Sequence, residues 1–178
     1  MRECHAQTYL NKRSIAVRPS KRALHSVNLR VRLTDARDKD WNIASEIFSV
    51  TSFSELARDA REVERWNRLH PTDGARRSHV ESLLAGNAPI VAATDYVRAY
   101  PQLIGSYTRA RFVALGTDGF GRSDTRSALR GFFEVDRHHV AIAALDALAR
   151  DGAIGSDVVA EALTRYGVNT DAIPPWEA

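Results

Sequence analysis

The chain has 178 residues, 44% of them hydrophobic and 26% charged, so it can bury the core of one domain. No apolar run approaches the roughly 18 residues of a membrane span, and residues 1–14 lack the apolar core of a secretory signal. Cys4 is the only cysteine, which excludes an internal disulfide and a cysteine-based zinc site and favours the reducing cytoplasm.

Most of the positive charge lies in residues 1–36. They hold eight Lys or Arg against two acids, a net +6, so the remaining residues carry −3 of the total +3. Such a segment can bind nucleic acid through its phosphates, which is one alternative function. Tyr9 is its only aromatic residue, however, so bases would find little to stack on. We therefore interpret residues 1–36 as an irregular, solvated leader.

The first regular elements alternate in type. Residues 26–34 alternate apolar and polar side chains, which predicts an edge strand within the leader. Residues 45–52, SEIFSVTS, indicate a buried strand. Ser52 and Glu55 then have capping-box spacing, so a helix is expected to begin there and to end before Pro71. Its acidic and basic residues interleave, as on a solvated, ion-paired face.

The second half continues this alternation. We expect a short helix at 76–86 closed by Gly86, a strand at 88–95, and a helical segment at 96–108 that Pro101 interrupts. A strand at 111–118 precedes a helix at 124–133 capped by Ser123, and a further apolar helix ends at Gly152. The final helix should be capped by Ser156 and stopped by Gly167. Strands alternating with helices predict a three-layer α/β/α fold with a mostly parallel sheet over residues 37–178.

The stretch GTDGFGRSD, residues 116–124, has the strand–glycine–helix arrangement of many phosphate sites. Its glycine order is not that of a dinucleotide loop, and a carboxylate stands inside it, so the nucleotide interpretation is weak. The preferred interpretation is a tight turn in which Gly119 and Gly121 take positive φ while Phe120 packs away. An alternative is a stand-alone protein that binds an anion here. The loop residues concerned are Asp118, Gly119, Gly121, Arg122, Ser123 and Asp124.

No other pattern indicates catalysis. His138 and His139 are adjacent and would point about 100° apart on a helix, so they cannot chelate one metal ion. No G-x-S-x-G motif exists, and Cys4 beside His5 has no catalytic setting. We assign no catalytic, cofactor-binding or metal-binding residue.

Four long stretches resemble one family. These are SVTSFSELARDAREVERWNRLHP, APIVAATDYVRAY, ALGTDGFGRSDTRSALRGFFEVD and VAIAALDALARDGAI. They resemble the C-terminal domain of the bacterial homodimeric pyruvate dehydrogenase first component, a thiamine-dependent enzyme of the transketolase-like superfamily. The resemblance runs from about residue 40 to residue 171. It implies a transketolase C-terminal-like fold in a truncated fragment with an unrelated leader.

The resemblance also implies a function. The parent enzyme decarboxylates pyruvate with thiamine diphosphate and Mg²⁺ and acetylates the lipoyl group of the dihydrolipoyl acetyltransferase. Two earlier domains and a dimer mate form its active site, and its metal motif begins with G-D-G, which is missing here. We therefore expect a non-catalytic structural and assembly domain that binds no cofactor itself. Its expected partners are the remaining domains, the dimer mate and, in the parent complex, the acetyltransferase.

Overall fold

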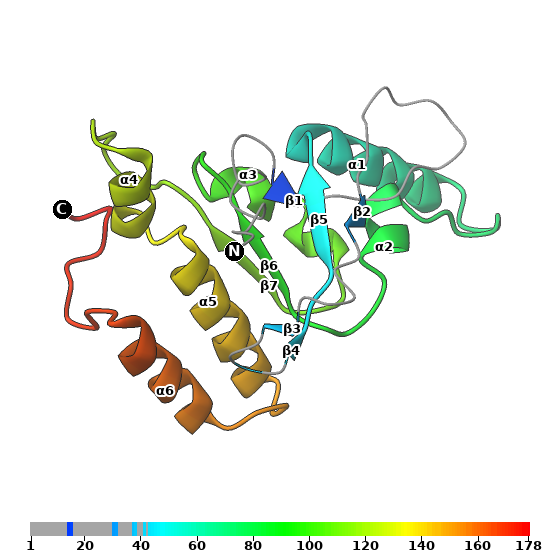
Figure 1. The fold of residues 1–178 in the computed structure, drawn as a ribbon. Helices are drawn as coiled ribbons and strands as arrows, with labels where there is room; N and C mark the ends of the chain where they lie inside the picture. The colour runs from blue at the N-terminus through cyan, green and yellow to red at the C-terminus, as the bar shows by residue number, and fades with distance from the viewer. Residues whose placement is uncertain (1–13, 16–29, 32–36, 39–40, 42) are drawn as a thin grey trace. The chain divides into compact units, whose positions relative to one another are not determined.

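The computed structural model describes residues 14–15, 30–31, 37–38, 41 and 43–178 (Figure 1). The chain divides into two compact units, residues 1–84 (unit 1) and residues 85–178 (unit 2). Most of the predicted leader lies outside the described residues, as does most of the predicted strand 26–34. Of that strand the structure describes Arg30–Val31, which are extended.

The strands of unit 1 pair in antiparallel fashion. β5 (Ile47–Val50) lies between β1 (Ser14–Ile15) and β2 (Arg30–Val31). β3 (Arg37–Asp38) pairs with β4 (Ile43–Ala44). The prediction of a buried strand at 45–52 is only partly right. Val50 is buried but Ile47 is 48% exposed, because only part of this short strand faces the core.

Helix α1 (Phe53–Leu69) forms as its sequence predicts. The hydroxyl of Ser52 accepts a 3.2 Å hydrogen bond from the backbone amide of Glu55, which satisfies one of the free donors of the first turn. The apolar residues repeat at helical spacing, and the buried ones are Phe53, Ala57 and Ala60. The helix stops two residues before Pro71, whose ring would clash with a continued turn.

Helix α2 (His79–Leu83) is shorter than the predicted 76–86 and begins with a complete capping box. The buried Ser78 hydroxyl accepts from the Glu81 amide, and a Glu81 carboxylate oxygen accepts from the Ser78 amide at 2.7 Å. Asp59 of α1 accepts the His79 amide at 2.7 Å. The prediction of a solvated charged face on α1 is therefore wrong for Asp59, which joins two helices.

Unit 2 is built on one parallel strand pair. β6 (Ile90–Ala93) and β7 (Phe112–Leu115) run parallel, with Ile90 opposite Phe112, which confirms the predicted direction. The chain crosses between them through α3 (Ala99–Gln102) and the 3₁₀ helix η2 (Gly105–Tyr107). These two short elements replace the single predicted helix at 96–108. A Cβ on Gly105 would lie 3.2 Å from the Phe112 ring, so this segment turns where the chain approaches β7 closely.

Three helices complete unit 2: α4 (Arg126–Phe132), α5 (Arg137–Arg150) and α6 (Ser156–Tyr166). In Figure 1, α5 and α6 lie side by side, and α5 also contacts β6 and β7. Buried apolar residues of the strands, the helices and the turn before η2 form the core of this unit, among them Ala92, Ile104, Leu145, Ala147 and Ala162.

Two predicted helix caps are wrong. Thr125, not Ser123, caps α4, because its hydroxyl reaches the Ala128 amide at 3.3 Å. Gly155 is the N-cap of α6, so Ser156 is already helical. The stop at Gly167 is confirmed, since its φ of +64° is the left-handed conformation that glycine adopts without strain. No helix in the described ranges is long and apolar enough to cross a membrane.

Candidate functional site

The glycine-rich loop at residues 116–124 follows β7 directly, and its carboxylate is already engaged. Asp118 accepts a 2.9 Å hydrogen bond from the backbone amide of Arg98 and a second bond from the Arg98 guanidinium. Burial alone would raise the pKa of Asp118, but these bonds and the charge of Arg98 hold that pKa below its usual range. The two opposite charges thus neutralise each other beside the loop.

Two glycines of the loop are needed because other backbone segments approach them. A Cβ on Gly116 would lie 2.6 Å from the carbonyl oxygen of Tyr96. Gly119 has a φ of +101°, and a Cβ there would lie 2.8 Å from the carbonyl oxygen of Pro175. Positive φ at Gly119 is thus confirmed. The same prediction is wrong for Gly121, which keeps an ordinary φ and where an added Cβ would meet no atom within 4 Å.

The segment around Pro175 and Trp176 covers the loop. Pro175 is buried, and the Arg98 guanidinium lies 4.7 Å from the centre of the Trp176 ring, within the range of a cation–π contact. Phe120, between the last two glycines, is 85% exposed, so the prediction that it packs away is wrong. The room above Gly119 is filled by the chain's own backbone.

The remaining loop residues have separate partners. The Arg122 guanidinium lies over the Phe132 ring at 4.1 Å. Asp124 accepts the amide of the adjacent Thr125 at 2.6 Å. Anion binding by Arg122, Ser123 and the start of α4 stays a prediction.

The histidines of unit 2 also contact different partners. The His138 ring stacks on Tyr166 with ring centres 4.6 Å apart. His139 Nδ1 lies 2.9 Å from a carboxylate oxygen of Asp136, the N-cap of α5. Burial alone would raise the pKa of Asp136, yet hydrogen bonds from His139 and His138 and the charge of His139 hold it below its usual range. Within residues that the structure describes, no three His, Cys, Asp or Glu side chains gather to hold a metal ion.

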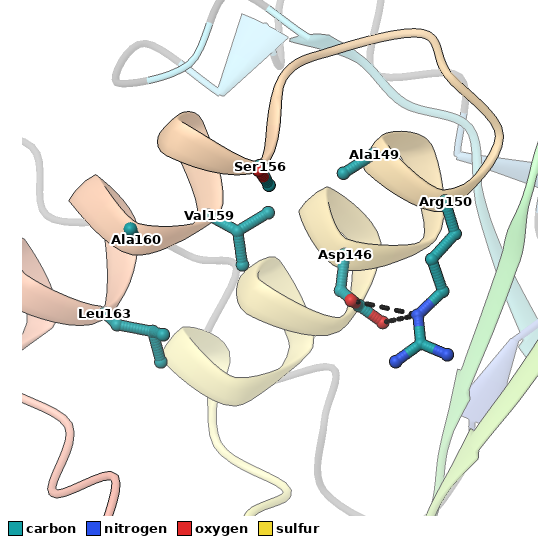
Figure 2. Close-up of a pocket in the computed structure, with 7 residues that line it drawn as sticks. All are labelled: Asp146, Ala149, Arg150, Ser156, Val159, Ala160 and Leu163. Carbon is teal, nitrogen blue, oxygen red and sulfur yellow. Dashed lines mark hydrogen bonds and ion pairs between the residues drawn. The ribbon is translucent and has the colours of Figure 1, made fainter.

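A hollow of about 350 Å³ lies between α5 and α6 (Figure 2). Val159 and Leu163 point into it from α6, and Asp146 and Arg150 of α5 point toward each other at one end. The Arg150 Nε atom lies 2.8 Å from a carboxylate oxygen of Asp146. The residues that line the hollow are Asp146, Ala149, Arg150, Ser156, Val159, Ala160 and Leu163. The mostly apolar wall and its paired charges offer no nucleophile beside a base.

Sequence reasoning missed Arg98 and Trp176, which complete the loop. Arg98 lies twenty residues before Asp118, and no local pattern links the two positions. Trp176 did carry a signal, since a tryptophan in a short proline-containing segment seldom stays fully solvated.

The chain is similar in sequence to a known domain family and to several known proteins. The model of the transketolase-like TK C-terminal domain matches residues 25–136. The chain is 52% identical over 142 residues to the pyruvate dehydrogenase E1 component of Cupriavidus necator, covering 79% of this chain and 16% of that protein. It is 49% identical over 140 residues to the one from Pseudomonas aeruginosa, covering 78% and 16%.

The E1 component of Escherichia coli K12 is 44% identical over 138 residues, covering 77% of this chain and 15% of that relative. The chain is thus similar to the C-terminal region of these relatives and spans about one sixth of their length. The parallel strand pair and its helices agree with the predicted α/β/α class. The chain belongs to the family of transketolase-like C-terminal domains.

Proposed function

We propose that this chain is a non-catalytic structural and assembly domain of a pyruvate dehydrogenase E1 component. One observation carries the proposal: in the glycine-rich loop, which resembles a phosphate-binding loop, the chain's own residues occupy the positions that a ligand would need. Its carboxylate is held by Arg98, and the space above Gly119 is occupied by Pro175. A loop filled in this way acts by packing rather than by binding a cofactor.

The catalytic chemistry is assigned to the remaining polypeptide of the parent. That enzyme would oxidatively decarboxylate pyruvate on thiamine diphosphate and Mg²⁺ and acetylate lipoyl groups. The residues described here do not fit that metal, since no three His, Cys, Asp or Glu side chains converge among them. The chain spans only 15–16% of its relatives, which leaves ample polypeptide for the cofactor site.

The partners follow from the same role. We assign contacts to the other E1 domains and to the dimer mate, and place the dihydrolipoyl acetyltransferase in the parent complex. The single cysteine agrees with a cytoplasmic setting.

Calorimetric titration tests the proposal. Thiamine diphosphate with Mg²⁺ is titrated into the purified chain, and the full-length E1 component of C. necator is the positive control. We expect no saturable heat from the chain and no decarboxylation of pyruvate. One-to-one binding in the micromolar range would show that the chain holds a cofactor site and that the proposal is wrong.

A further inference from the structure

Large exposed apolar side chains gather around the glycine-rich loop of unit 2. Nine such residues are exposed in the described part of the chain, and five of them lie on the segments that meet at this loop. Phe120 is 85% exposed and Tyr96 69%, while the others are about half exposed. We call this group the loop patch, and its members are Tyr96, Val97, Tyr100, Phe120 and Trp176.

The fold holds the loop patch in place. The carbonyl of Tyr96 accepts the Thr117 amide at 2.9 Å, and the Tyr96 and Tyr100 rings lie 5.8 Å apart. Trp176 approaches the loop through its backbone beside Gly119, and its ring lies against Arg98, the partner of Asp118 in the loop. Since these segments are fixed to one another, binding a partner there would need little ordering of the chain.

The composition of the loop patch is that of a protein interface. Tyr, Trp, Phe and Arg are the residues enriched at interface centres, where a polar rim surrounds them. Here Arg98 and Asp118 form an ion pair beside the aromatic rings, and Arg130 lies 4.0 Å from Asp95 nearby in the sequence. Because Arg98 is paired with Asp118, the cation next to the Trp176 ring is neutralised within the chain itself.

We propose that the remaining polypeptide of a pyruvate dehydrogenase E1 component docks on the loop patch through an apolar surface of its own. The inference rests on the proposed function and names where that function acts. The relatives carry about five sixths of their length outside the region that this chain spans. A preformed aromatic surface of this kind is what such a large neighbour would cover.

A chimeric enzyme tests the docking site. In this chimera, residues 37–178 replace the matching region of the C. necator E1 component. A double variant of the chimera carries both Tyr96→Ser and Phe120→Ser. The matched control is Leu69→Ser, which removes another exposed apolar side chain at the end of α1. The readouts are the rate at which limited proteolysis releases the graft and the enzyme's activity toward pyruvate.

We expect the double variant to release the graft at least about tenfold faster than the unsubstituted chimera, because exposed aromatic anchors dominate docking. Leu69→Ser should leave the rate unchanged. In the isolated chain both variants should melt within about 2 °C of the parent chain, since these side chains are exposed.

Two results would overturn the inference while leaving the proposed function intact. In the first, the chimera is stable and active, and the double variant releases its graft at the parent rate. In the second, the isolated chain is a dimer that the double variant dissociates, so the loop patch binds a second copy. If the unsubstituted graft is inactive and released at once, the proposed function is wrong and the inference falls with it.

Discussion

The carboxylate of Asp118 bonds both the backbone amide and the guanidinium of Arg98, so it ties the loop after β7 to the segment after β6. Parallel strands end at the same edge of a sheet, and this pair of residues joins the two segments that leave that edge. Asp118→Ala should lower the free energy of unfolding by about 1–2 kcal/mol, because it removes partly exposed charge-assisted bonds.

Urea denaturation followed by circular dichroism measures this loss. Asp124→Ala, in the same loop, is the control and should change stability by less than about 0.5 kcal/mol, since its carboxylate accepts the amide of the next residue. Equal effects of the two substitutions would mean that Arg98 does not secure the loop.

Gly119 and Gly121 form a matched pair for testing the loop backbone. Gly119→Ala should destabilise the chain by about 2 kcal/mol or more, because the new Cβ meets the Pro175 carbonyl at a positive φ. Gly121→Ala should be neutral or stabilising by about 0.4–1 kcal/mol, since its φ is ordinary and its surroundings are open. Thermal melts of both variants decide, and the reverse order would contradict the described packing.

Glu134 follows Phe133, the C-cap of α4, and takes a backbone conformation that normally favours glycine. Its φ is +56°, its amide bonds the Gly131 carbonyl at 3.2 Å, and the Val135 amide bonds the Arg130 carbonyl at 3.0 Å. These two bonds form a Schellman motif. Glu134→Gly should therefore raise the free energy of unfolding by about 1 kcal/mol.

Gly167→Ala is the mirror test at the end of α6, where a glycine already occupies the left-handed position. It should cost about 1 kcal/mol. Both changes are measured by urea denaturation. A destabilised Glu134→Gly variant would show that the Glu134 side chain contributes more than its backbone strain costs.

Asp136 should make stability depend on pH. Its pKa is held below the usual range by His139 and His138, so the unfolded chain binds more protons between the two pKa values. Its stabilisation is fully present above the unfolded pKa of about 3.9 and is lost as the pH falls through the folded pKa.

Asp136→Asn removes this titration while keeping a good helix cap. The free energy of unfolding, measured from pH 6 to pH 3, should fall less steeply in the variant. Unchanged helix content by circular dichroism is the control that α5 still begins correctly. Parallel pH profiles for the variant and the parent chain would mean that Asp136 makes no such contribution.

Local patterns predicted most of unit 2 and α1. Ser52 and Gly167 act within one turn of their own helices, so spacing alone reveals them. Thr125 and Ser123 are both competent caps two positions apart, and only the path of the loop decides between them. The predicted helix start was therefore wrong where two neighbouring residues could each serve as the N-cap.

The site was harder to predict because its contacts are not local. Asp118 meets Arg98 across twenty residues, as Asp59 meets His79 in unit 1, and no periodicity encodes either contact. Glycine spacing correctly indicated a tight turn at Gly119, but it could not show that Pro175 fills the turn. The exposure of Phe120 depends on which segments pack around the loop, and the loop's own sequence does not predict those segments.

The cover that Pro175 places on Gly119 also has a consequence during synthesis on the ribosome. Pro175 is translated 56 residues after Gly119, so β6, β7 and the glycine loop exist for some time before their cover. During that interval the Arg98–Asp118 pair can form, but the ring of Trp176 cannot yet reach Arg98. Nascent chains stalled before Pro175 should therefore display an open loop that proteases cut faster than they cut the same loop in the finished chain.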